Sequence, residues 1–84
     1  MDNKVCIDLI VPVIEERYNV FIPVNKKTIE IIFLLNKAIN ELTDNCFPIS
    51  NKLNLINANT GVGYDVNLTF KENGILNGSK LILM

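Results

Sequence analysis

The chain has 84 residues, which is enough for one domain and too few for a second hydrophobic core. Hydrophobic residues make up 49% of it, and eight basic and nine acidic side chains give a formal net charge of −1. Nucleic-acid binding depends on a basic face that neutralises phosphates, so this balance argues against a nucleic-acid partner. We expect one globular domain spanning residues 1–84.

No part of the sequence is typical of a targeting or membrane segment. Asp2 and Lys4 precede a strand-like run, and no apolar stretch with a small-residue cleavage site follows them. The longest apolar-rich stretch, residues 29–35, contains Glu30 and is far shorter than the ~20 residues needed to cross a bilayer. We therefore expect a cytoplasmic protein without membrane insertion.

The residue types that carry catalysis and metal binding are sparse. Cys6 and Cys46 form no metal-ligand spacing, the chain has no histidine, and we expect both cysteines to be reduced and to pack as small hydrophobes. Without histidine, a Cys or Ser nucleophile lacks its usual base. Asp8, Asp65 and Glu72 would need a cleft, which a domain this small rarely builds. We expect no catalytic residue, no cofactor and no metal, and hence no enzyme.

The first 24 residues predict a β-hairpin. Residues 5–13 alternate, with Val5, Ile7, Leu9, Val11 and Val13 on one face, and residues 18–24 alternate again after a polar break at 15–17. The second strand, with Pro23 near its end, suits an edge of the sheet.

After the hairpin, the apolar residues change from alternate positions to helical spacing, and residues 28–42 predict an amphipathic helix. Thr28 is the expected N-cap and Glu30 lies in the first turn. The expected buried stripe is Ile31, Ile32, Leu35, Ala38, Ile39 and Leu42, with Leu34 on its flank. The expected polar side is Glu30, Asn36, Lys37, Asn40 and Glu41, and Phe33 falls in the middle of it.

The rest of the chain predicts short elements. A loop over 43–52 leads to a strand at 53–55, a short returning strand at 62–65, and a helical turn over 67–74 that ends at Gly74. A turn at 77–78 precedes a last strand at 80–84, with Leu81 and Leu83 facing inward. These elements predict an α+β domain of two layers, a mixed four- to five-stranded sheet packed on one long helix.

Two segments carry a resemblance to a known superfamily. The hairpin leading into Thr28-Ile29-Glu30, and the end segment with Leu68-Thr69, Glu72, Gly74-Ile75, Asn77-Gly78-Ser79 and Leu81-Ile82-Leu83, resemble the ubiquitin-like superfamily. The resemblance implies a β-grasp fold, in which the first and last strands lie parallel at the centre. The chain is most similar to the bacterial YukD/EsaB family, small cytoplasmic proteins associated with type VII (WXG100) secretion. This implies an accessory or regulatory role that depends on a protein partner.

Two other functions stay open. Sulfur carriers and conjugated modifiers of this superfamily present a C-terminal Gly-Gly, whereas this chain ends in Leu83-Met84, which disfavours them. The other alternative is that the chain is a structural subunit of a larger assembly. Ubiquitin binds its partners through an apolar patch on the outer face of its sheet. The central isoleucine of that patch aligns with Asn54 or Ile56 of this chain, and the patch residue on the last strand aligns with Met84.

The predicted contact residues are Phe33, Ile10, Ile56 and Met84. Strand alternation puts Ile10 and Ile56 on the sheet face away from the helix, where together they would form a docking patch. Phe33 is either a partner contact or, together with Ile29, a cover for an edge of the core. The edge strand at 18–24 offers a second docking mode by strand addition. The partner and the oligomeric state stay open.

Overall fold

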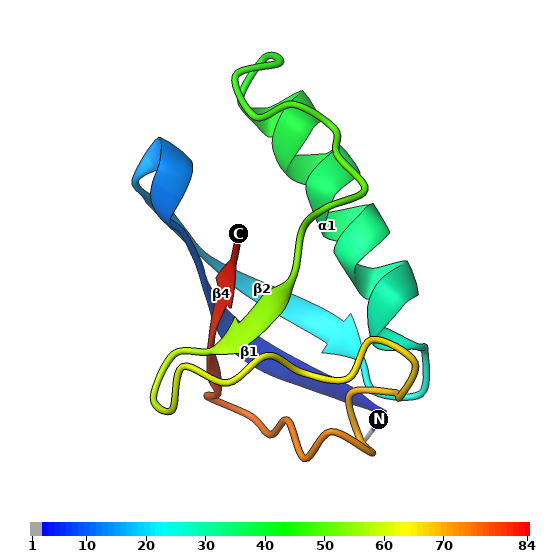
Figure 1. Cartoon of the computed structure of the whole chain (residues 1–84). Coiled ribbons are helices and arrows are strands. Elements are labelled where there is room, and N and C mark those ends of the chain that lie inside the picture. The colour runs from blue at the N-terminus through cyan, green and yellow to red at the C-terminus, as the bar shows by residue number, and fades with distance from the viewer. Residues whose placement is uncertain (1–2) are drawn as a thin grey trace.

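One face of a mixed sheet is covered by a single long helix in the computed structural model, which describes residues 3–84 (Figure 1). The elements are β1 (Lys4–Val11), a 3₁₀ turn η1 (Pro12–Ile14), β2 (Glu16–Pro23), α1 (Thr28–Leu42), β3 (Leu55–Asn57) and β4 (Lys80–Leu83). The strand order is β2-β1-β4-β3, with β1 and β4 parallel and the other neighbours antiparallel. The expected two-layer α+β architecture, with the first and last strands parallel at the centre, is confirmed, with four strands.

The core lies between the central strands and α1. Inward residues of β1 and β4 are almost completely buried, namely Ile7, Leu9, Val11, Leu81 and Leu83. Ile31, Ile32, Leu35 and Ile39 of α1 pack against them, and Phe47, Phe70 and Ile75 close the core from the connecting segments. Burying such a side chain contributes about 1.5–3 kcal/mol, so these residues supply most of the stability.

The first strand is shorter than its alternating pattern. It ends at Val11 because Pro12 begins η1, and Glu15 then adopts a left-handed conformation with φ of 55° that starts β2. Val13 was expected to face inward, but it lies in this turn and is 75% exposed. That expectation is wrong, because a period-two pattern does not show where a strand ends.

Thr28 is not the N-cap of the helix. Lys27 holds that position without a side-chain cap, and Thr28 is the first helical residue and fully buried. The backbone N–H of Thr28 donates to the carbonyl of Leu68 at 2.8 Å, and the N–H of Ile29 donates to the carbonyl of Val66 at 2.9 Å. A neighbouring loop therefore satisfies the free N–H groups that a capping side chain would otherwise satisfy.

One border of the expected buried stripe faces solvent instead. Leu34 is 51% exposed, Leu42 is 71% exposed, and Ala38 is also exposed. The stripe that faces the sheet is centred on Leu35 and Ile39, so residues on the Leu34 and Ala38 side turn away from it. The expectation that Ala38 and Leu42 are buried is therefore wrong.

The opposite border is buried under an irregular segment. Asn36, expected on the polar side, is 1% exposed. Its side-chain Nδ2 donates to the carbonyl of Pro48 at 3.1 Å, and its Oδ1 accepts from the N–H of Ser50 at 2.7 Å. The crossing segment covers Asn36 and pairs both ends of its amide, so a polar side chain is buried without an unsatisfied group.

The connection to β4 is held by turns. The expected strand at 62–65 is wrong, since only Gly63 forms an isolated bridge, to Ile56. One of its hydrogen-bonded turns joins the N–H of Asn73 to the carbonyl of Thr69 at 3.0 Å, and Gly74 follows with φ of 75°. This confirms the left-handed residue expected there, which glycine adopts without steric cost.

Three further findings concern the described part of the chain. Cys6 and Cys46 are both free thiols. Within residues 3–84, no group of three or more His, Cys, Asp or Glu side chains is placed to hold a metal ion. Over the same residues, we find no helix with the length and hydrophobicity that a membrane span requires.

Candidate partner-binding surfaces

Three isoleucines form a continuous row on the outer face of the sheet. In the parallel β1–β4 pair Ile10 is the register partner of Ile82, and in the antiparallel β3–β4 pair Ile56 is also the partner of Ile82. All three are half-buried, while their strand neighbours Leu9 and Leu81 are fully buried under α1. Since successive residues alternate faces, Ile10, Ile82 and Ile56 point away from the helix. We call them the sheet row.

Met84 extends this row past the end of β4. Its N–H donates to the carbonyl of Asn54 at 3.1 Å, and the N–H of Asn54 donates back to Met84 at 2.7 Å. Met84 is 58% exposed and shares the outer face with Ile82, two residues earlier. Asn54 and Ile56 are the two positions that could match the central isoleucine of ubiquitin's patch. Ile56 is in register with Ile82, and Asn54 lies beside Met84.

The structure thus brings together three of the four predicted contact residues, through a residue that sequence reasoning missed. Ile82 lies between Ile10 and Ile56, because β4 lies between β1 and β3. Without an apolar side chain at position 82, the width of β4 would separate the two isoleucines. The signal for Ile82 was present, since Leu81 and Leu83 on either side were expected to face inward.

Charged side chains from three strands border the sheet row: Arg17 on β2, Asp8 on β1 and Lys80 on β4. Arg17 is the register partner of Ile10, and its guanidinium donates to the carboxylate of Asp8 at 2.5 Å. This hydrogen bond and the attraction of Asp8 raise the pKa of Arg17 above its ordinary value. Lys80 lies opposite Asp8 on β4. An apolar centre with a polar rim is the usual composition of a protein-binding surface.

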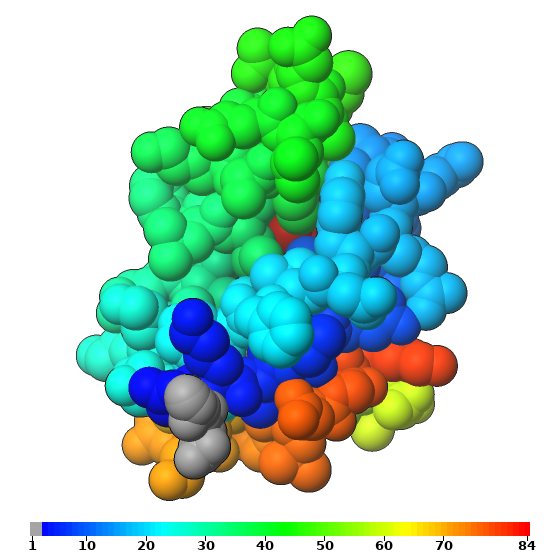
Figure 2. Space-filling view, turned by 180° about the vertical axis from the view of Figure 1, so that it is seen from behind, coloured from blue at the N-terminus to red at the C-terminus, as the bar shows by residue number. Residues whose placement is uncertain are grey.

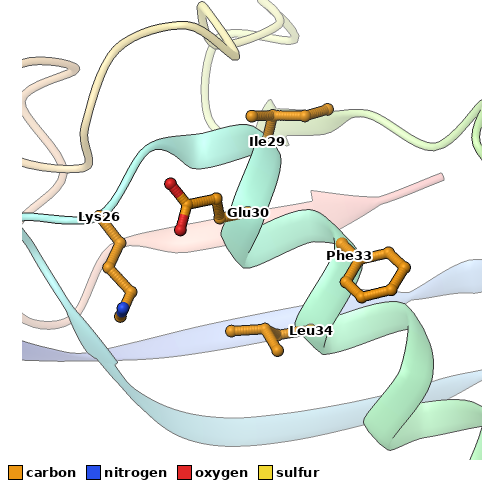
Figure 3. A pocket seen from close by; sticks show the side chains of 5 residues that line it. All are labelled: Lys26, Ile29, Glu30, Phe33 and Leu34. Atoms are coloured by element: carbon orange, nitrogen blue, oxygen red, sulfur yellow. The ribbon is translucent and has the colours of Figure 1, made fainter.

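Phe33 lies on a second surface, the exposed side of α1. It is 60% exposed, and Ile29 and Leu34 are also about half exposed, at 47% and 51%. These side chains, with Lys26 and Glu30, line an open concavity (Figure 3). A neighbouring hollow lies between Phe33 and the crossing segment at Ser50. Phe33 is therefore a surface residue, and the alternative that it covers an edge of the core is wrong.

The sheet also has an open edge. β2 is the outermost strand beside β1, as expected, and its residues run along the surface in the view from behind (cyan in Figure 2). Phe21, 71% exposed, lies on it.

Similar folds occur in known proteins. No protein-family model and no curated protein matches the sequence. Among solved structures, the ubiquitin-like domain of EccD5 from Mycobacterium xenopi superposes with a TM-score of 0.77 over 96% of this chain and 92% of that one, at 16% identity. The chain has the ubiquitin-like β-grasp fold.

Two other structures share this ubiquitin-like fold. The ubiquitin-like domain of the Mycobacterium tuberculosis type VII secretion protein EccD1 superposes with a TM-score of 0.73 at 9% identity, covering 96% of this chain and 97% of that one. A chain of an ESX-5 inner membrane complex matches with a TM-score of 0.70 at 14% identity, over 98% of this chain and 21% of that chain. At such low sequence identities the similarity shows the fold and does not show the function.

Proposed function

We propose that this chain is a non-enzymatic interaction module that docks a protein partner non-covalently on its sheet row. The observation that carries the proposal is the register of Ile10, Ile82 and Ile56 across three strands, on the sheet face away from α1. Isolated exposed apolar residues are common, but a contiguous apolar group rimmed by charges is typical of a binding site. The methyl groups of the row offer apolar contact area, which favours a binding role.

The system we propose is type VII secretion, in which the chain acts on the cytoplasmic side as an accessory or regulatory component. Two lines support it: the sequence resembles the YukD/EsaB family, and its fold is similar to the ubiquitin-like domain of EccD1, which is named as a type VII secretion protein. Genes for a WXG100 protein and an FtsK-type ATPase beside this one would strengthen the proposal. Thiamin or molybdopterin genes would weaken it.

Calorimetric titration against purified soluble domains of the neighbouring secretion components, the ATPase first, tests the proposal. We expect the unmodified chain to bind one of them and Ile82→Arg to lose that binding, because the substitution puts a charge at the centre of the row. Val62→Arg is the matched control, since Val62 is 64% exposed and lies outside the row.

Two outcomes would contradict the proposal in different ways. If no component of the machinery binds the unmodified chain, the assignment to secretion fails. If Ile82→Arg binds as well as the unmodified chain does, the sheet row is not the docking surface. A C-terminal adenylation or thiocarboxylate assay that produced an adduct at Met84 would instead support a covalently transferred protein.

A further inference from the structure

The exposed side of α1 carries an ordered stripe of charges around an apolar centre. Its members are Lys26 just before the helix, then Glu30, Phe33, Leu34, Lys37 and Glu41. Every one of them is exposed. The spacing of three, one, three and four places the five members within α1 along one side of the helix, and Lys26 lines the same concavity as Glu30, Phe33 and Leu34. A second helix could therefore contact all six at once. We call these six residues the helix stripe.

The helix stripe is complementary to itself when it is read backwards. If a second copy is laid antiparallel with a two-fold axis between Phe33 and Leu34, each residue meets a fitting one. Glu30 then faces Lys37 of the second copy, and Lys26 faces its Glu41. Phe33 meets Leu34, and both contacts occur twice by symmetry. All four charges thereby gain an opposite partner.

Other arrangements lose this match. In a parallel pair, Lys would lie against Lys and Glu against Glu along the whole helix, which is repulsive. Within residues 3–84, the structure shows one ion pair, between Asp8 and Arg17. The charged side chains of the helix stripe therefore form no ion pair with other residues in this range. The order of signs therefore favours a second copy in one orientation.

We propose that two copies associate through antiparallel α1 helices, with the helix stripe as the interface. The concavity in Figure 3 is the contact region: Ile29 and Phe33 lie along one side of the helix, and Glu30 and Leu34 along the other. Leu34 of the second copy enters beside Phe33, and its Lys37 reaches Glu30. The spacing suits the shallow crossing angle of about 20° at which such helices pack.

The size of the contact sets its strength. α1 has 15 residues, which makes it about 22 Å long at a rise of 1.5 Å per residue. The six residues of the helix stripe would be buried from each copy, against roughly 20–30 a side in a standard stable interface. The dimer is therefore weak, concentration-dependent and sensitive to salt. It goes beyond the proposed function, because it leaves both sheet rows free and facing away from each other, which makes the pair bivalent.

Sedimentation equilibrium of the purified chain tests the association, over protein concentrations from roughly 10 µM to 1 mM, the range in which weak complexes populate. We expect a monomer–dimer equilibrium that weakens as salt screens the charges. Phe33→Glu is expected to weaken the dimer about tenfold or more, since it puts a charge in the apolar centre. Val62→Glu, a matched exposed position, is expected to leave it unchanged. A chain that stays monomeric at the highest concentration in low salt overturns the proposal.

Charge reversal tests the antiparallel register itself. Glu30→Lys alone and Lys37→Glu alone each turn two facing pairs from attractive to repulsive, so each variant is expected to dimerise about tenfold more weakly. An equimolar mixture of the two variants restores every opposite pair, so a heterodimer is expected at the original strength or close to it. Circular dichroism of each variant shows that it is folded. A mixture that associates no better than its separate variants excludes this register.

Discussion

The two apolar surfaces of the molecule differ in how they are assembled. The helix stripe comes from one continuous run of chain, residues 26–41, and all its members except Lys26 are placed by helical spacing. The sheet row collects Ile10, Ile82 and Ile56 from the beginning, the end and the middle of the chain. One surface is local and the other is made by the fold.

Because of this difference, the two surfaces depend on different parts of the fold. The helix stripe keeps its order of charges wherever α1 is helical. The sheet row exists only while β4 lies between β1 and β3 in the observed register, because a shift by one residue would turn Ile82 inward. Changes to the core should therefore affect the sheet row through the fold, and surface changes should affect one surface at a time.

The largest effect is expected for Leu81→Ala. Leu81 is fully buried in β4 beside Leu9, and truncating such a side chain removes apolar contacts and leaves a cavity. We expect a loss of about 2–5 kcal/mol in the free energy of unfolding, measured by urea denaturation. Leu76→Ala, at a site 68% exposed, is the control and should change little. A small effect at Leu81 would mean that β4 does not hold the sheet together.

For Asn36→Ala we expect a smaller loss in the free energy of unfolding, about 1–3 kcal/mol. The change leaves the carbonyl of Pro48 and the N–H of Ser50 without their hydrogen-bond partners. Hydrogen exchange should report faster opening of residues 47–52, on the helix side of the molecule, with the sheet row unaltered. Lys37→Ala, on the exposed side of the same helix, is the control. Equal stability of the two variants would show that the Asn36 amide does not pin this segment.

Ile10→Ser should separate the two surfaces. It removes apolar area from one end of the sheet row, so we expect weaker binding of the protein partner in titration calorimetry. The dimer measured by sedimentation should be unchanged, because Ile10 lies on the face away from α1. Equal loss of both activities would contradict the assignment of two independent surfaces.

The smallest effect is expected for Asp8→Asn. It removes the ion pair with Arg17, whose side chain is 62% exposed, and pairs in contact with water stabilise little. The midpoint of thermal unfolding should move less than it does for Asn36→Ala. A large shift would mean that the rim of the sheet row is part of the structural framework.

Much of the fold could be predicted from the sequence because its cues are local. Alternation at residues 5–11 and 18–24, the helical period over 28–42, and the glycines at 74 and 78 each reflect backbone geometry within a few residues. Three of the misplaced residues share another feature. Asn36, Thr28 and Val13 are decided by a neighbouring segment or by where an element ends, and periodicity carries neither.

The sequence by itself determined that Ile10 and Ile56 lie on the outer side of their strands, whereas it left Phe33 open between a partner contact and a cover for an edge of the core. It also contained the full order of charges in the helix stripe, since helical spacing needs no distant contact. Only the tertiary structure decided that Ile82 lies between Ile10 and Ile56. The physical reason is that strand periodicity specifies a face but not a neighbour, and neighbours are chosen when distant segments bury their inner sides together.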